Sequence, residues 1–158
     1  MKKILLILMA MFAFGIQNVS AQDAIKIVTG HPDLKFQIKR CVAQGKIVII
    51  DMTITNNTEN DIDVLMGETN CGPTVVYDSE GNTYDDWHKK PIKVGNKNFF
   101  ENFRGKLISG VPVKVQLKIQ DFSEKAESIA RLDFMFWSDQ LNLGCSHAVI
   151  IRNIPVTR

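Results

Sequence analysis

The feature that most constrains this fold is an alternation of apolar and polar side chains with a period of two residues. Residues 112–120 show it most clearly, with Lys114, Gln116 and Lys118 separating apolar neighbours on both sides. Successive side chains of a strand point to opposite faces, so this period predicts a strand with one buried face. The apolar set that is expected to face inward is Val111, Val113, Val115, Leu117 and Ile119.

Similar short segments recur along the chain, separated by turn-forming residues. They predict strands at residues 24–29, 34–43, 46–55, 62–66, 74–77, 129–137 and 147–154. Residues 56–61 and 78–82 are rich in Asn, Asp, Ser and Gly, which favours turns. Asp121 and Glu124 have the spacing of a capping box, which predicts a short helical turn over 121–128. Residues 85–110 show the least regular pattern, and no segment predicts a long helix.

About seven to nine short strands with polar turns predict an all-β chain. The expected architecture is an antiparallel immunoglobulin-like β-sandwich with one short helical turn. A small β-barrel is the alternative. We expect residues 22–158 to form one domain, because no linker, repeat or low-complexity segment divides them.

The first 21 residues have the pattern of a secretory signal peptide. Lys2 and Lys3 precede an apolar run at 4–16, and small or β-branched residues lead to Ala21. The run is shorter than the roughly 20 residues that span a bilayer. We therefore expect cleavage after Ala21 and export to the periplasm or the cell exterior, with no membrane span in the remaining chain. An N-terminal membrane anchor is the alternative.

The charge balance excludes an overall basic field. The chain has 19 Lys and Arg against 17 Asp and Glu, and removal of Lys2 and Lys3 leaves 19 − 2 = 17 basic residues. The remaining chain is formally neutral, so nucleic acid is not an expected partner.

Three cysteines, Cys41, Cys71 and Cys145, follow the predicted cleavage point. An exported protein can form disulfides, and three cysteines allow at most one internal bridge. All three pairings are open. Cys71–Cys145 is favoured because both residues lie in segments that resemble loops or strand ends, which leaves Cys41 as the free thiol. Strict alternation would place Cys41 on the polar face of its strand, whereas a bulge near Arg40 would turn it inward.

Several segments together are similar to a family of small exported domains from Bacteroides-like bacteria. They are residues 36–57 (FQIKRCVAQGKIVIIDMTITNN), 76–84 (VYDSEGNTY), 110–119 (GVPVKVQLKI), 130–134 (ARLDF) and 151–156 (IRNIPV). The chain resembles a telokin-like, immunoglobulin-like family of unknown function. The resemblance implies a sandwich fold, export and no known enzymatic activity, and it carries over no binding site. Residues 70–72 and 85–105 lie outside it.

No catalytic or phosphate-binding motif appears. The sequence has no Gly-x-Ser-x-Gly elbow, no Ser-x-x-Lys and no glycine-rich phosphate loop, so we expect a protein that is not an enzyme and has no cofactor. No metal site is expected. A weaker hypothesis is an envelope metal-handling or redox protein that uses Cys145, His147 and the unpaired thiol, because Cys145 and His147 would share one face of a strand.

Aromatic residues gather in the irregular stretch and form the candidate binding site. They are Trp87, Phe99, Phe100 and Phe103, with His88 beside the first. Aromatic side chains on loops can anchor a protein or carbohydrate. The alternative is that they cover the open edge of the core. The sequence thus favours an exported, non-enzymatic immunoglobulin-like module that binds a protein or glycan of the cell envelope, or supports envelope assembly.

Overall fold

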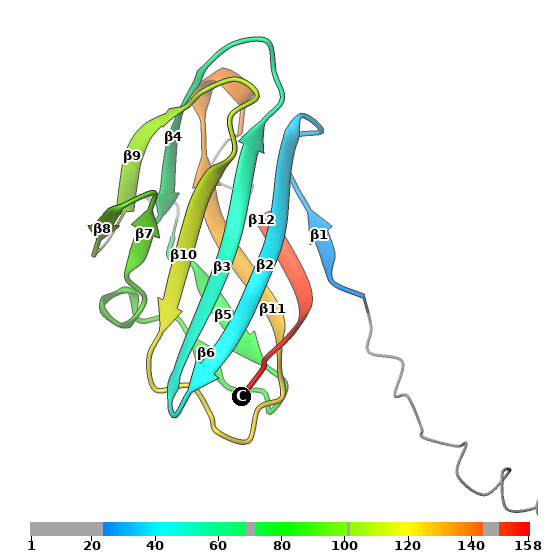
Figure 1. Cartoon of the computed structure of the whole chain (residues 1–158), viewed down its shortest axis with the longest axis vertical. Coiled ribbons are helices and arrows are strands. Elements are labelled where there is room, and N and C mark those ends of the chain that lie inside the picture. Colours follow the sequence, from blue (N-terminus) through cyan, green and yellow to red (C-terminus); the bar gives the residue numbers. More distant parts are fainter. Residues whose placement is uncertain (1–23, 69–71, 101, 144–148) are drawn as a thin grey trace, which may run out of the picture.

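A computed structural model describes residues 24–68, 72–100, 102–143 and 149–158, and it forms two antiparallel β-sheets (Figure 1). The five-stranded sheet has the order β2–β3–β10–β7–β8. Its strands are β2 (Leu34–Gln44), β3 (Ile47–Asn56), β10 (Val113–Ile119), β7 (Ile92–Val94) and β8 (Lys97–Phe99).

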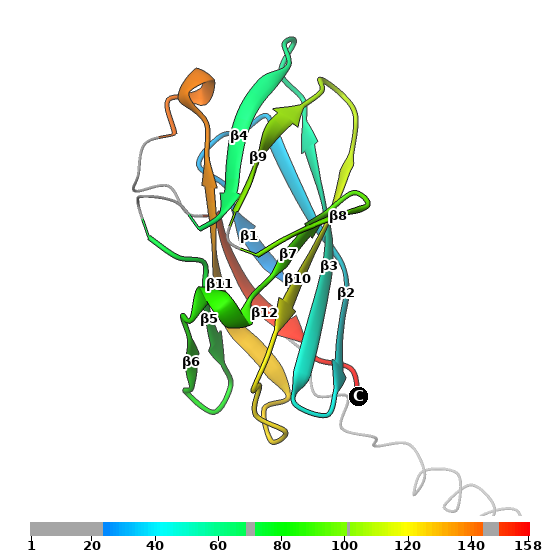
Figure 2. The ribbon, with the colours of Figure 1, turned by 90° about the vertical axis from the view of Figure 1, so that its left-hand side faces the viewer.

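The seven-stranded sheet has the order β1–β12–β11–β4–β9, and β5 joins β11 and β6 to it. Its strands are β1 (Lys26–Val28), β12 (Val149–Pro155), β11 (Ser128–Trp137), β4 (Ile62–Gly67), β9 (Asn102–Leu107), β5 (Val75–Asp78) and β6 (Thr83–Tyr84). The two sheets lie face to face as two layers (Figure 2). The all-β prediction with antiparallel sheets is confirmed.

The core fills the space between the two layers, as the alternating pattern requires. Val48, Ile50, Met52 and Ile54 of β3 are all at most 1% exposed. Phe36 of β2 contacts Phe134 and Phe136 of β11 edge to face, with ring centroids 6.4 and 5.6 Å apart. These contacts join the two sheets across the middle of the domain.

The structure has twelve strands in its described part, more than the seven to nine predicted. The additional strands lie mainly in the stretch that showed no regular pattern, where β7, β8 and β9 form. In β8, Lys97 and Asn98 are exposed and Phe99 is half-buried, so no alternation of apolar and polar residues predicts a strand here. Pairing with β7 fixes it instead, through Ile92 opposite Phe99 and Val94 opposite Lys97. Neighbouring strands, rather than local sequence, decide the conformation here.

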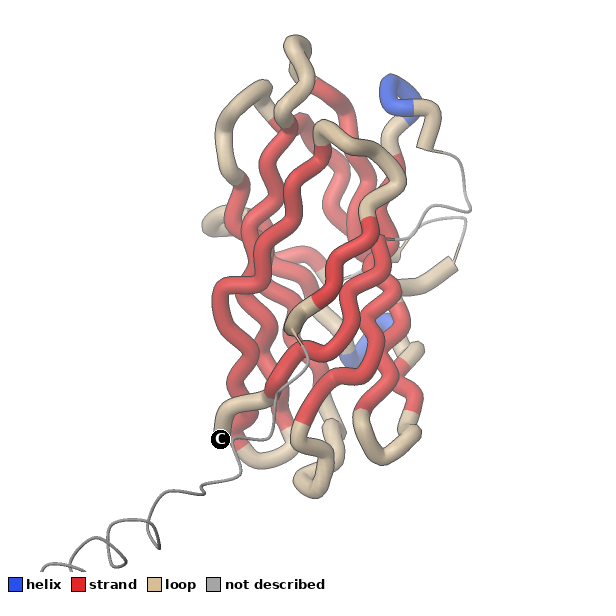
Figure 3. The backbone as a smooth tube through the Cα atoms, turned by 90° about the vertical axis from the view of Figure 1, so that its right-hand side faces the viewer, coloured by secondary structure: helices blue, strands red, loops and turns tan. Residues whose placement is uncertain are grey.

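The predicted helical turn over 121–128 is wrong, since this segment forms bends and turns. Asp121 has φ 59°, in the left-handed region, whereas an N-cap residue needs an extended backbone. Phe122 is fully buried, and its N–H donates to the Lys46 carbonyl at 2.9 Å. Burial of this ring therefore directs the chain. The described helical segments are two short 3-10 turns, η1 (Trp87–Lys89) and η2 (Asp139–Leu141), both outside the sheets (Figure 3).

A bulge in β2 settles the position of Cys41. The register shifts between Ile38, opposite Met52, and Arg40, opposite Asp51, so Lys39 is the extra residue. The shift turns Cys41 inward, where it is 5% exposed and free. Of the two positions left open by the sequence, the buried one is therefore correct. The signal segment up to Ala21, the favoured Cys71–Cys145 bridge and the Cys145/His147 pair lie outside the described residues.

Candidate functional site

The outer face of the five-stranded sheet is strongly basic. The face carries six basic side chains, which we call the basic face: Lys35, Lys39, Arg40, Lys93, Lys114 and Lys118. They alternate with core residues on β2, β10 and β7, and this alternation directs them to solvent. Asp51 of β3 is the one acidic residue on the face within the described chain. The formal charge of this surface is therefore 6 − 1 = +5.

The strand register arranges most of this surface in three rows across the sheet; Lys35 lies in a further row with Thr55, and Lys39 is the extra residue of the bulge. One row holds Gln37, Thr53 and Lys114; the next holds Arg40, Asp51, Gln116, Lys93 and Asn98; the third holds Val42, Ile49 and Lys118. Adjacent rows are two residues apart along β10, or about 7 Å. Basic groups from three strands that are far apart in sequence thus form one surface.

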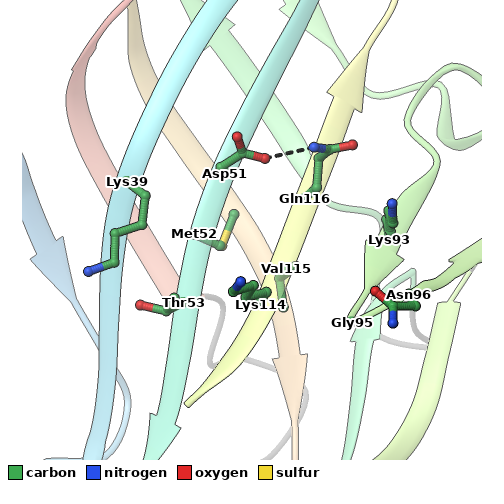
Figure 4. Close-up of a pocket in the computed structure, with 10 residues that line it drawn as sticks. All are labelled: Lys39, Asp51, Met52, Thr53, Lys93, Gly95, Asn96, Lys114, Val115 and Gln116. Carbon is green, nitrogen blue, oxygen red and sulfur yellow. Dashed lines mark hydrogen bonds between the residues drawn. The ribbon is translucent and has the colours of Figure 1, made fainter.

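The centre of the basic face is hollowed. A cavity of about 460 Å³ is lined by Lys39, Lys93 and Lys114, together with Thr53, Asn96 and Gln116 (Figure 4). These side chains come from β2, β3, β10, β7 and the turn between β7 and β8, where Gly95 adopts φ 57°. The cavity therefore combines ammonium groups with neutral amide and hydroxyl groups, and the Asp51 carboxylate also lines it.

Asp51 is fully engaged by its neighbours. One carboxylate oxygen accepts from Arg40 Nε at 2.7 Å and from Nη2 at 2.6 Å. The other accepts from Gln116 Nε2 at 2.7 Å (Figure 4). The described ion pairs include none for Lys39, Lys93 or Lys114, so their ammonium groups keep their charge exposed to a partner. Such a surface attracts anions.

The near-zero net charge of the whole chain conceals this site, because it sums charges from all surfaces. The missed signal was available: Lys114 and Lys118 occupy the predicted outer positions of one strand, and Lys35 and Lys39 those of another. The pairing of these strands through β3 could not be read from the sequence, and only that pairing joins their charges.

The predicted aromatic site is only partly assembled. Phe99 and Phe103 are half-buried and meet edge to face at 5.2 Å, against the core. The Phe103 ring lies over Gly105, where an added Cβ would be 2.2 Å from Cζ. Phe100 is 77% exposed, and His88 lies exposed in η1. Trp87 also belongs to η1. The interpretation of Phe99 and Phe103 as a cover of the core edge fits these contacts better than an aromatic binding surface.

Two buried polar groups near this region were not expected from the sequence. Lys90 is only 6% exposed, and burial lowers its pKa to about 8 although nearby carboxylates of Asp85, Asp86 and Glu68 act in the opposite direction. Within the described chain, neither Lys90 Nζ nor Glu68 Oε2 has a hydrogen-bond partner. These groups are withdrawn from solvent, unlike the lysines of the basic face.

The Cys41 thiol and the Asp78 carboxylate both have surroundings that suit a structural role rather than a reactive one. Burial raises the pKa of the Cys41 thiol to about 12, which keeps it protonated and poorly nucleophilic. Asp78 accepts from the backbone N–H groups of Glu80 and Asn82, from Asn82 Nδ2 and from Tyr84 Oη, at 2.8–2.9 Å. Burial would raise the pKa of Asp78, but these hydrogen bonds outweigh it and lower the pKa. This carboxylate anchors the turn between β5 and β6.

Among the residues with described positions, no group of three or more His, Cys, Asp or Glu side chains could hold a metal ion. The same residues contain no helix that is long and apolar enough to cross a membrane. Models of protein families and curated protein sequences yield no match to this chain.

Proposed function

We propose that this chain is an exported, non-enzymatic binding module with an immunoglobulin-like sandwich, and that it holds an acidic partner on its basic face. The two antiparallel layers and the family resemblance support the fold assignment. The secretory pattern of the first 21 residues supports export. The partner belongs to the cell envelope or its surroundings.

The observation that carries this proposal is the concentration of unpaired positive charge on one flat sheet face. A formal charge of 6 − 1 = +5 lies on this face although the chain after Ala21 is neutral. The lysines of this face have no ion-pair partner among the described residues that would offset their mutual repulsion. Their gathering around a hollow is best explained by an anionic partner that offsets the repulsion.

The alternative, a metal-handling or redox protein, has weaker support. It requires Cys145 and His147, which lie outside the described residues, together with a reactive unpaired thiol. Cys41 does not suit that role, because it is buried and its pKa is raised to about 12. Metal and redox chemistry would therefore depend on the other two cysteines.

Charge reversal on each outer face tests the proposal. The test variant is Lys39→Glu, Lys93→Glu and Lys114→Glu; the matched control, on the seven-stranded sheet, is Lys26→Glu, Arg104→Glu and Arg152→Glu. Both lower the net charge by six. Binding to immobilised dextran sulfate at several salt concentrations is the readout, and circular dichroism verifies folding.

We expect the test variant to lose at least about tenfold in affinity and the control to remain within about threefold of the wild type. Affinity should fall steeply with salt, since the surface charges are solvent-exposed. Equal losses in the two variants would contradict the proposal, as would a wild type that binds neither dextran sulfate nor any other polyanion.

A further inference from the structure

We infer that the partner of the basic face is a linear polysaccharide with one carboxylate on each sugar, such as a polyuronate. This inference rests on the proposed function and specifies its ligand. Three features of the basic face support it: the spacing of the lysines, the neutral polar side chains between them, and the lack of outward-facing aromatic side chains on the described strands.

The free charges are sparse and regularly placed. Each of the three cross-strand rows holds one lysine that has no ion-pair partner within the described residues: Lys114, Lys93 and Lys118. Lys35 lies in a further row opposite Thr55, and Lys39, at the bulge, donates to Gln37 Oε1 at 2.8 Å. The rows are about 7 Å apart along the strands. Single ammonium groups that are separated by neutral residues suit a polymer whose negative charges are also single and spaced. A polymer with several sulfates on each sugar would call for closer clusters of cations.

Neutral hydrogen-bonding groups separate these charges. Gln37, Thr53, Gln116 and Asn98 occupy positions in the first two rows, beside the lysines. Amide and hydroxyl side chains both donate and accept, as sugar hydroxyls do. A purely electrostatic surface would not need these groups, whereas a charged sugar polymer can use both kinds of contact.

One end of the same face is aliphatic. Val42, Ile47 and Ile49 are half-buried there, and Val42 and Ile49 share the third row with Lys118. The C–H faces of sugar rings can bury part of this apolar surface. An extended polymer that crosses the three rows could therefore contact charged groups, hydrogen-bonding groups and apolar side chains one after another.

Other polyanions fit this surface less well. The aromatic residues of β2, β3, β10, β7 and β8 are Phe36 and Phe99, and both pack against the core rather than on the basic face. Stacking of unpaired bases therefore has no platform. Val28 and Val111, two of the most exposed large apolar residues, lie on β1 and ahead of β10, and Phe100 directly follows β8, so the basic residues themselves have no exposed apolar anchor among them for insertion into a lipid surface.

Polygalacturonate is the probe that tests the inference, and its fully methyl-esterified form is the matched control. Esterification removes the carboxylate charge and leaves the sugar chain intact. Dextran, dextran sulfate, single-stranded DNA and phosphatidylglycerol vesicles complete the set. The protein variants are Lys93→Gln, Lys114→Gln and Lys118→Gln combined, against Lys26→Gln, Arg104→Gln and Arg152→Gln combined. Calorimetry at 0.15 M salt gives the affinities.

We expect polygalacturonate to bind at least about tenfold more tightly than its methyl ester, dextran, DNA or vesicles. The triple substitution on the basic face should weaken this binding at least about tenfold, and the control triple less than threefold. If DNA, vesicles or dextran sulfate bind through the basic face and polygalacturonate does not, the inference is overturned while the proposed function stands. If none of the polyanions binds, or both triple variants lose equally, both are overturned.

Discussion

The outer faces of the two sheets both carry more basic than acidic residues, but they use their charges differently. The seven-stranded sheet has five basic residues, Lys26, Arg104, Lys106, Arg131 and Arg152, against Asp63 and Asp133, or 5 − 2 = +3. The basic face carries 6 − 1 = +5. The larger difference lies in what the charged groups contact.

On the seven-stranded sheet, four of these seven charged residues pair with one another, and Lys26, Arg104 and Arg152 have no ion pair among the described residues. Arg131 Nε donates to Asp133 at 2.6 Å, and its guanidinium lies 5.9 Å from the centroid of the Tyr77 ring. Lys106 is 3.8 Å from Asp63, and Asp78 is enclosed by four hydrogen bonds. Among the described residues, the basic face forms one ion pair, between Arg40 and Asp51, and its five lysines have none. Charges with internal partners shape the fold, and charges without them are available to a ligand.

The largest expected effect tests the bulge in β2, because the bulge determines which residues of this strand belong to the basic face. Cys41 is the inward neighbour of Arg40, and its pKa is raised from 9.0 to about 12. We expect iodoacetamide at pH 8 to modify Cys41 about a thousandfold more slowly in the native protein than in urea, because the thiolate fraction falls by that factor.

Peptide mass spectrometry separates Cys41 from the other two cysteines. The same Cys41 peptide in urea is the internal control. Similar rates in the native and unfolded protein would mean that Cys41 points outward, and the register of Arg40 on the basic face would then be wrong.

The next effect concerns a structural charge of the seven-stranded sheet. We expect Asp78→Ala to lower the free energy of unfolding by about 3 kcal/mol at pH 7, because it removes four hydrogen bonds from a buried carboxylate. Glu80→Ala, in the same turn but exposed, should change it by less than about 0.5 kcal/mol. Urea unfolding measures both.

The pH dependence of this effect has a definite sign. The pKa of Asp78 is lower in the folded protein than its ordinary value of 3.8, so its contribution is complete above that value and is lost as pH falls through the folded pKa. The gap in unfolding free energy between wild type and Asp78→Ala should therefore narrow below about pH 4. A gap that stays constant down to pH 2 would contradict this assignment.

A smaller effect is a gain in binding. Asp51→Asn removes the one acidic charge of the basic face and frees Arg40. We expect affinity for polygalacturonate to rise about threefold at 0.15 M salt, the size of one partly screened charge interaction. Unchanged or weaker binding, measured by calorimetry, would show that the ligand does not approach Asp51.

The smallest effect is expected on the opposite face. Asp133→Asn breaks the Arg131 ion pair, whose two side chains are 38% and 17% exposed. Such a pair contributes less than about 1 kcal/mol to stability. The free energy of unfolding should fall by no more than that, with no change in affinity for polygalacturonate. A threefold gain here, matching that of Asp51→Asn, would erase the distinction between the faces.

The alternation of apolar and polar residues predicted the long strands of the fold correctly. The alternation in residues 112–120 and 46–55 corresponds to β10 and β3, whose inner positions are buried. The strand β8 was missed because pairing with β7, not periodicity, defines it, as Lys97 and Asn98 show. The strands β7 and β9 do alternate, but over only three and six residues. The turn over 121–128 was wrong because burial of Phe122 outweighs a capping pattern.

The candidate site was harder to predict, because it depends on which strands pair with one another. Phe99 and Phe103 indicated a binding surface, yet they pack together against the core. Lys39, Lys93 and Lys114 come from three segments of unremarkable sequence, and only the register of four strands brings them to one cavity. Local sequence can predict that each lysine faces solvent, but not that the three share one surface.

The most direct test of the central claim is a map of the binding surface by backbone amide chemical shifts, with and without a short galacturonate oligomer. We expect the chemical-shift changes to be concentrated in β2, β3, β10 and β7, around Lys39, Lys93 and Lys114, and to become smaller as the salt concentration is raised. Shifts concentrated in β11, β12 and β4, or around Phe100, would contradict it.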